Sequence, residues 1–96
     1  MSVSVVWLDS AAADLDRILD FIEQESPQGA LAMAHAIRRG ADVLLSDYPA
    51  AGRIGRRRGT RELVIASTPF IVVYRVRERG ARIEILRVLH GKQQWP

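Results

Sequence analysis

The sequence predicts a single α+β domain, residues 1–96, in which a helical hairpin packs on one face of a mostly antiparallel four-stranded sheet. Two stretches of the first half have helical apolar spacing and are separated by Ser26-Pro27. Three stretches of the second half are strand-like and are separated by short turns. One short β-branched stretch precedes the helices, so the expected order is β-α-α-β-β-β.

The first strand and the first helix are adjacent in the sequence. The stretch Val3–Leu8 is short, β-branched and apolar, which is typical of a strand. Asp9 or Ser10 is expected to cap the following helix, because a short polar side chain accepts a hydrogen bond from a free amide of the first turn. The helix is predicted over Ala11–Gln24, where apolar residues recur at helical spacing and form one stripe: Leu15, Ile18, Leu19 and Ile22.

The second helix is predicted from Pro27 to about Leu45. Ser26 is a favourable N-cap, and proline is tolerated at the first helical position because its missing N–H would be unpaired there anyway. The short connection predicts that the two helices form an antiparallel hairpin. Close approach to the neighbouring helix is expected on an alanine-rich face: Ala30, Ala34, Ile37, Ala41 and Leu44.

The C-terminal half is predicted to form the rest of the sheet. Asp47-Tyr48-Pro49 ends the helices, and residues 50–60 form an irregular basic loop with three glycines and four arginines. Phe70–Val76 is apolar on both faces and is placed centrally in the sheet, and Trp7 and Tyr74 are expected to pack in the core. The remaining strands and turns are Arg61–Ala66, Phe70–Arg77, Arg82–His90, Ser67-Thr68-Pro69 and Glu78-Arg79-Gly80.

Acidic and basic residues are separated into different halves of the chain. Residues 1–52 contain three arginines and eight carboxylates, which gives −5, whereas residues 53–96 contain ten arginines, one lysine and three carboxylates, which gives +8. The net charge of +3 therefore conceals a strongly basic C-terminal half. This asymmetry indicates an anionic partner, either nucleic acid or an acidic protein.

Composition excludes several classes of site. The chain has no cysteine, which excludes disulfides and thiolate–metal sites, and His35 and His90 lie far apart, so we expect no metal site and no cofactor. No stretch approaches 18 apolar residues, so no membrane span is expected. The N-terminus MSVSVVW lacks the features of a signal peptide, and a cytoplasmic location is expected.

Three segments carry a resemblance to a known group of proteins. They are WLDSAAADLDRILDFIEQESP, GTRELVI followed by FIVVYRV, and the C-terminal IEILRVLHGKQQWP. Together with the order of elements they resemble the RelE/ParE superfamily of bacterial type II toxins. The resemblance implies a small toxin that is encoded beside a cognate antitoxin, whose segment folds along the toxin surface and neutralises it.

The superfamily divides by target. RelE-like members resemble ribosome-dependent mRNA endoribonucleases, and ParE-like members resemble poisons of DNA gyrase. Cleavage of RNA without a metal requires a base, a cation that stabilises the phosphorane and an acid for the leaving group. By resemblance, the ribonuclease branch uses an arginine on the strand that matches Arg61–Ala66 and a tyrosine near the C-terminus. Here that strand ends in apolar residues and Trp95 stands in place of the tyrosine; an indole cannot act as acid or base.

Gyrase poisoning is therefore the favoured prediction, and the LRVLH ending also resembles the ParE-like branch. Gyrase poisoning requires a binding surface and no catalytic group. If the chain is instead a ribonuclease, the candidate catalytic residues are Arg61, Arg87 and His90. A plain nucleic-acid-binding domain is a weaker alternative, and a toxicity assay separates it from both toxin readings.

Candidate binding residues fall into two groups. Each group also has a structural alternative. The basic candidates could form a solvated run of charge or pair with Glu62 and Glu84 across strands, and Trp95 could anchor the C-terminal tail. The apolar candidates could belong to the core. The predicted target-binding residues are Arg56, Arg57, Arg58, Arg61, Arg75, Arg87, His90, Lys92 and Trp95. The predicted antitoxin-binding residues, an apolar surplus on the second helix, are Leu31, Met33, Val43 and Leu45.

Overall fold

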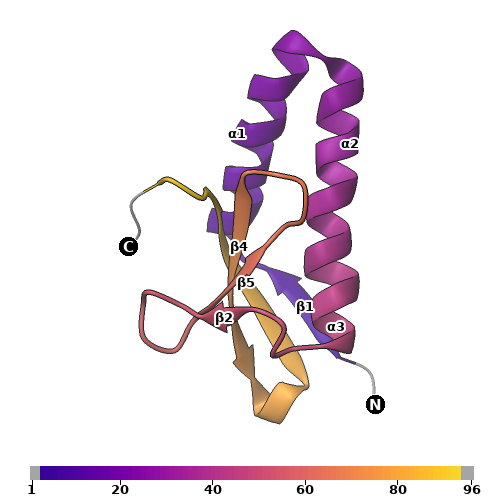
Figure 1. Cartoon of the computed structure of the whole chain (residues 1–96). Coiled ribbons are helices and arrows are strands. Elements are labelled where there is room, and N and C mark those ends of the chain that lie inside the picture. Colours follow the sequence, from indigo (N-terminus) through magenta and orange to yellow (C-terminus); the bar gives the residue numbers. More distant parts are fainter. Residues whose placement is uncertain (1–2, 94–96) are drawn as a thin grey trace.

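The computed structural model describes residues 3–93. Strand β1 (Ser4–Trp7) leads into helices α1 (Asp9–Glu25) and α2 (Pro27–Arg38), which lie side by side as an antiparallel pair (Figure 1). A π-helical turn, η1 (Arg39–Leu44), and the short helix α3 (Leu45–Asp47) extend α2. The other elements are β2 (Arg53–Ile54), β3 (Arg61–Val64), β4 (Phe70–Arg77), the 3-10 turn η2 (Glu78–Gly80) and β5 (Arg82–His90).

The strands form one sheet in the order β1-β5-β4-β3-β2. Only β1 pairs in parallel, with β5, and all other neighbours are antiparallel. The predicted α+β class and the central position of β4 are confirmed. The predicted strand count is wrong by one, because Arg53 and Ile54 pair with Glu62 and Arg61 inside the segment that was expected to be irregular. A backbone hydrogen bond of 2.8 Å from Gly55 to Thr60 lets the chain reverse there and add this fifth strand.

The hydrophobic core lies between the helices and one face of the sheet. Tyr74 is fully buried, as predicted, whereas Trp7 is only partly buried. The Trp7 indole Nε1 donates to Asp42 Oδ1 at 2.8 Å, and the Arg38 guanidinium carbon lies 5.5 Å from the ring centroid. The main buried side chains of the core are Ala11, Leu15, Ile37, Ala41, Leu45, Leu63, Ile65, Val72, Tyr74, Ile83, Ile85 and Val88.

One of the two predicted helix caps is correct. Ser26 Oγ accepts from Gly29 N at 2.9 Å, and Pro27 occupies the first helical position of α2. The prediction that Asp9 or Ser10 caps α1 is wrong, because α1 already begins at Asp9 and no side chain caps it. Ser10 Oγ instead donates to Leu86 O at 2.7 Å, at a bulge of β5 where Leu86 has no partner in β4.

The π-helical turn changes which residue of the second helix faces the core. Leu44 was expected to face the neighbouring helix, but it is 40% exposed and Leu45 is fully buried. The amide of Leu45 reaches back five residues to Gly40 O, and this wider turn accommodates one extra residue and moves the buried face along by one. Gly40 permits the close approach to β3, since a Cβ there would lie 2.5 Å from Ile65 Cδ1.

Tyr74→Phe is expected to destabilise the fold by about 1–3 kcal/mol, because it leaves one buried and one partly buried backbone group unpaired. The Tyr74 hydroxyl accepts from Gly52 N at 2.8 Å and donates to Pro49 O at 2.7 Å, fixing the segment that enters β2. Urea denaturation measures the change. The control is Tyr48→Phe, which removes a hydroxyl from a side chain that is 65% exposed; an equal loss in both variants would contradict the prediction.

Candidate functional site

Three carboxylates organise most of the arginines in the described part of the chain. They are Glu62 on β3, Glu84 on β5 and Asp14 on α1, and side-chain ion pairs join them to seven guanidinium groups. Seven positive charges on three negative ones leave a surplus of four. The carboxylates therefore position the arginines without neutralising them, and the arginines are Arg17, Arg53, Arg56, Arg75, Arg77, Arg82 and Arg87.

Glu62 holds the β2–β3 loop against the sheet through hydrogen bonds. Its side chain is fully buried, and its Oε2 accepts from both the backbone N and the side-chain Nε of Arg56, at 2.8 and 3.1 Å. Arg53 Nη2 donates to Oε1 at 3.2 Å. Burial by itself would raise the pKa of Glu62, but the hydrogen bonds from Arg56 and Arg53 outweigh it and hold the pKa below its usual value.

Glu62→Gln is expected to cost about 1–2 kcal/mol at neutral pH and to reduce the acid sensitivity of the fold. Because the folded pKa of Glu62 is lowered, its contribution to stability is complete above the usual value near 4.5 and is lost as the pH falls through the lower folded value. Urea midpoints between about pH 7 and pH 2 should therefore converge for the two proteins at the acid end. Glu23→Gln, at an exposed position of α1, is the control; a constant difference between Glu62→Gln and wild type at every pH would contradict this.

Glu84 gathers three arginines on the neighbouring strands. Arg75, its partner across the β4–β5 ladder, donates through Nε at 2.5 Å, and Arg82 donates at 3.1 Å. Arg77 Nε lies 3.5 Å from the same carboxylate. The hydrogen bond from Arg75, together with that from Arg82, lowers the pKa of Glu84, so Glu84 remains ionised. The three arginines around it leave a local surplus of positive charge.

Asp14 connects the first helix to the last strand. It is 3% exposed, and its Oδ2 accepts from Val88 N at 2.9 Å and from Arg87 Nε at 2.6 Å, while Oδ1 accepts from Arg87 Nη2 at 3.1 Å and from Arg17. This bidentate contact raises the pKa of Arg87. Sequence reasoning missed Asp14, although its position within the apolar stripe, beside Leu15, is a signal of burial.

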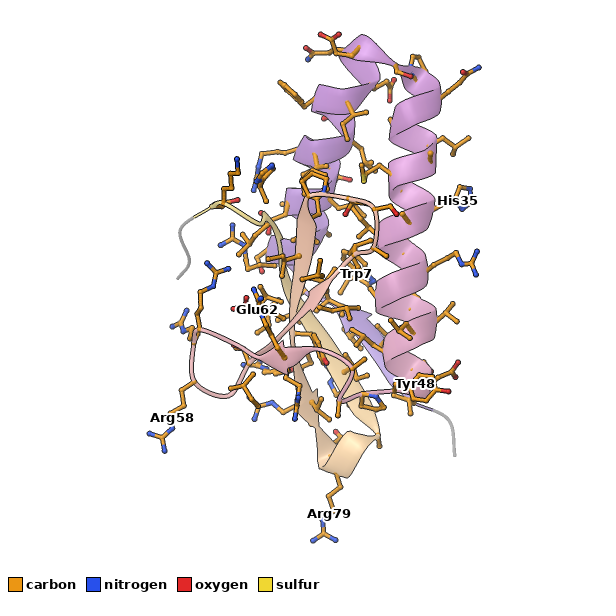
Figure 2. All side chains as sticks on the ribbon, viewed as in Figure 1. Trp7, His35, Tyr48, Arg58, Glu62 and Arg79 are labelled. Carbon is orange, nitrogen blue, oxygen red and sulfur yellow. The ribbon has the colours of Figure 1, made fainter. Side chains whose placement is uncertain are left out.

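The arginines meet at a cavity of about 500 Å³. The cavity lies where the β2–β3 loop, strands β4 and β5 and the start of α1 come together, and Figure 2 shows Arg58 reaching outward from that loop. None of the described residues that line it is acidic. We call it the arginine cavity, and its lining is Ser10, Arg57, Arg58, Gly59, Thr60, Arg75, Val76, Arg77, Leu86 and Arg87.

The structure brings some of the predicted target-binding residues together and separates others. Arg57, Arg58, Arg75 and Arg87 line the arginine cavity, and Arg77 joins them. Sequence reasoning did not select Arg77, although it follows Arg75 by two residues and so shares its face of β4. The other candidates lie elsewhere.

Those other candidates have distinct environments. Arg56 is held by Glu62, and Arg61 Nη1 donates to Gly52 O at 2.8 Å and lines a separate cavity with Ile54. Lys92 is exposed just beyond the end of β5, with its amide donating to His90 Nδ1 at 3.2 Å. Trp95 lies outside the described residues.

The three conditional catalytic candidates do not converge. Arg87 lines the arginine cavity, Arg61 the cavity beside Ile54, and His90 two small cavities next to α1. The His90 ring packs edge-on against Phe70 with 5.9 Å between the ring centroids. Within residues 3–93, no group of three or more His, Cys, Asp or Glu side chains could hold a metal ion. No described helix is long and apolar enough to span a membrane.

The predicted antitoxin-binding residues are also divided. Leu31 and Val43 are 62% and 55% exposed, and Met33 is partly buried and packs against the core. Leu45 is fully buried, so the prediction is wrong for this residue, which the π-helical turn directs inward. A second, mostly apolar cavity of about 540 Å³ lies between η1 and β3, and its lining includes Val43, Leu44, Leu63, Val64 and Ile65. We call it the η1–β3 groove.

The comparisons with known proteins identify the family. The profile described as "ParE toxin of type II toxin-antitoxin system, parDE" matches residues 5–95. The chain belongs to the ParE toxin family. It is thus a toxin of a type II toxin–antitoxin system within the RelE/ParE superfamily, as the sequence predicted.

Two curated relatives of this ParE-family chain carry toxin names. It is 42% identical over 90 residues to "Putative toxin Y4kP" of Sinorhizobium fredii, covering 94% of this chain and 90% of that protein. It is 38% identical over 87 residues to "Toxin RelE2" of Caulobacter vibrioides, covering 91% of this chain and 93% of that protein.

Solved structures show the same fold. A chain of the "Chromosomal ParDE TA system from P. aeruginosa" has 32% sequence identity and a TM-score of 0.80, over 92% of this chain and 95% of that one. A chain of the toxin–antitoxin complex RelBE2 from Mycobacterium tuberculosis has 24% identity and a TM-score of 0.63, over 94% and 99% of the two chains, and shows the fold alone.

Proposed function

We propose that this ParE-family toxin arrests growth by poisoning DNA gyrase and is neutralised by a cognate antitoxin. The observation that carries the proposal is the chemistry of the arginine cavity. The described lining gathers five guanidinium groups, and the other lining residues supply only hydroxyl, backbone and apolar groups. An arginine stays protonated at any physiological pH, and a hydroxyl does not titrate near neutrality, so this lining suits binding of an anion and not proton transfer.

The position of His90 supports the same conclusion. Histidine is the residue type most often used as a general acid or base, yet His90 lines different cavities from Arg87 and Arg61. General acid–base catalysis requires the acid or base within hydrogen-bond reach of the reacting atom. Binding to a gyrase–DNA complex requires no such convergence.

A supercoiling assay tests the proposal. The purified chain should block supercoiling of relaxed plasmid by gyrase and should accumulate cleaved DNA that is released by denaturing the enzyme. The mixture with antitoxin should regain normal supercoiling. Unchanged supercoiling at a large molar excess of the chain over gyrase would refute the proposal.

The similarity to a protein named Toxin RelE2 favours one alternative, ribosome-dependent cleavage of mRNA. Primer extension on cellular mRNA after induction of the chain would reveal cuts within codons under this alternative. His90→Gln should then abolish the cuts. Intact transcripts during growth arrest would leave gyrase as the target.

The η1–β3 groove is our proposed docking surface for an apolar segment of the antitoxin. The P. aeruginosa relative is a ParDE system, and toxins of such systems pair with an antitoxin. In the groove Val43, Leu44 and Val64 are exposed, and η1 leaves space beside β3. An exposed apolar patch of this kind is typical of a partner surface.

The double variant Leu44→Gln/Val64→Gln is expected to bind the antitoxin at least about tenfold more weakly, because two apolar contacts are lost. It should remain toxic, since the groove is distinct from the arginine cavity. Isothermal titration with the antitoxin measures the affinity. Phe21→Gln is the control, because Phe21 is 72% exposed on α1; equal weakening by this change would contradict the placement.

A further inference from the structure

We propose that the arginine cavity binds the phosphodiester backbone of nucleic acid, contacting about three phosphates without reading base sequence. The inference rests on the proposed function, because the DNA held by gyrase would supply those phosphates. It goes further by naming the ligand chemistry of the cavity and the residues that bind it.

The first step is the charge of the cavity. Five of its described lining residues are arginines, and three of them form ion pairs with two carboxylates, Glu84 and Asp14. The arginines of the lining outnumber these two carboxylates, which favours binding of an anion. The N-terminus of α1 also lies at the cavity through Ser10, and the helix dipole adds to the positive potential there.

Contacts with carboxylates hold three of the guanidinium groups in place before a ligand binds. Arg75 and Arg77 contact Glu84 through their Nε atoms. This contact orients each planar guanidinium group and leaves its Nη groups available to bind a ligand. Arg87 is fixed by its bidentate contact with Asp14. An arginine that is already held in place loses less conformational entropy when it binds a phosphate oxygen.

The residues that line the cavity also indicate which class of anion it binds. None of the ten described residues that line the cavity is aromatic, and none has a side-chain amide or carboxylate. Aromatic faces stack on bases, and amides and carboxylates read base edges, so this lining favours phosphates over bases. Phosphates suit arginine because two parallel N–H groups fit two phosphate oxygens. We therefore infer sequence-independent binding of the backbone.

Fluorescence anisotropy with a labelled DNA duplex of about 16 base pairs tests the inference. Binding of the purified chain should weaken with salt, with a slope of log affinity against log salt of about −2.7 for three phosphates. Two duplexes of unrelated sequence should bind equally well. A strong preference for one sequence would overturn the inference.

The variants locate the binding. Arg58→Gln and Arg77→Gln should each reduce the slope by about one and weaken binding at low salt. Arg79→Gln is the matched control, because Arg79 is an exposed arginine that extends outward from the β4–β5 turn (Figure 2) and does not line the cavity. Urea midpoints confirm that each variant is folded. Equal effects of Arg77→Gln and Arg79→Gln would overturn the inference, since they would indicate diffuse attraction by the whole basic half.

Two further outcomes separate this inference from the proposed function. If the chain binds a polyglutamate peptide in the same variant-dependent way but does not bind duplex, the cavity is a site for an acidic protein and the inference fails. If Arg77→Gln binds duplex as tightly as wild type does, while the wild-type chain poisons gyrase, the inference fails and the proposed function stands. Cavity-dependent duplex binding without gyrase inhibition supports the site and refutes the proposed function.

Discussion

Asp14→Ala is expected to lower the free energy of unfolding by about 3 kcal/mol. The change removes a 3% exposed carboxylate that accepts from the backbone of Val88 and from two nitrogens of Arg87. The Val88 amide is then buried without a partner, and the Arg87 guanidinium, whose side chain is 29% exposed, loses its counter-charge. A domain of this size has a stability on the order of 5–10 kcal/mol, so the loss is large.

Urea denaturation followed by circular dichroism measures this change. Asp16→Ala is the control, because Asp16 is an exposed aspartate of the same helix. The double variant Asp14→Leu/Arg87→Met should recover the part of the loss that comes from Arg87, since replacing both partners of an ion pair by apolar groups is often neutral, whereas the Val88 amide stays unpaired. A cost below about 1 kcal/mol for Asp14→Ala would show that water solvates Arg87 and Val88 at no penalty.

The variant Arg58→Glu/Arg77→Gln is expected to reduce gyrase inhibition by about 100-fold and to abolish growth arrest. The two changes remove three units of positive charge from the lining of the arginine cavity. Both side chains are well exposed, Arg77 to 54%, so the loss should occur without unfolding. The inhibitory concentration in a supercoiling assay and colony counts after induction measure the effect.

The control for this variant carries the same change in net charge elsewhere. Arg79→Glu/Arg38→Gln alters one arginine at the β4–β5 turn and one beside Trp7, neither of which lines the arginine cavity. It should inhibit gyrase nearly as well as wild type. If both double variants lose inhibition equally, net charge governs the interaction and the cavity has no special role.

Much of the fold could be predicted because the relevant signals are local. The order of the elements, the start of α2 at Ser26-Pro27 and the central place of Phe70–Arg77 follow from apolar periodicity and turn chemistry within a few residues. The errors in the fold occur where distant residues decide the outcome. Leu45 replaces Leu44 in the core because Gly40 approaches Ile65 and the helix takes up a π turn there.

The site was less predictable than the fold. The four predicted arginines that line the arginine cavity were selected together with Arg56 and Arg61, whose contacts with Glu62 and Gly52 hold them elsewhere. The alternation of residues along a strand predicts the face of the sheet to which a side chain belongs. It does not predict the partner that a long arginine side chain reaches.

The sequence by itself determined the family, the order of helices and strands, and the concentration of positive charge in the C-terminal half, because composition and periodicity are properties of neighbouring residues. Only the tertiary structure decided which arginines share a cavity. That choice depends on Asp14 and Arg87 meeting across 73 positions of the chain, and on a bulge at Leu86 that brings β5 against the start of α1. Contacts over such distances form when the packed core fixes the geometry of long side chains, and they leave no periodic trace in the sequence.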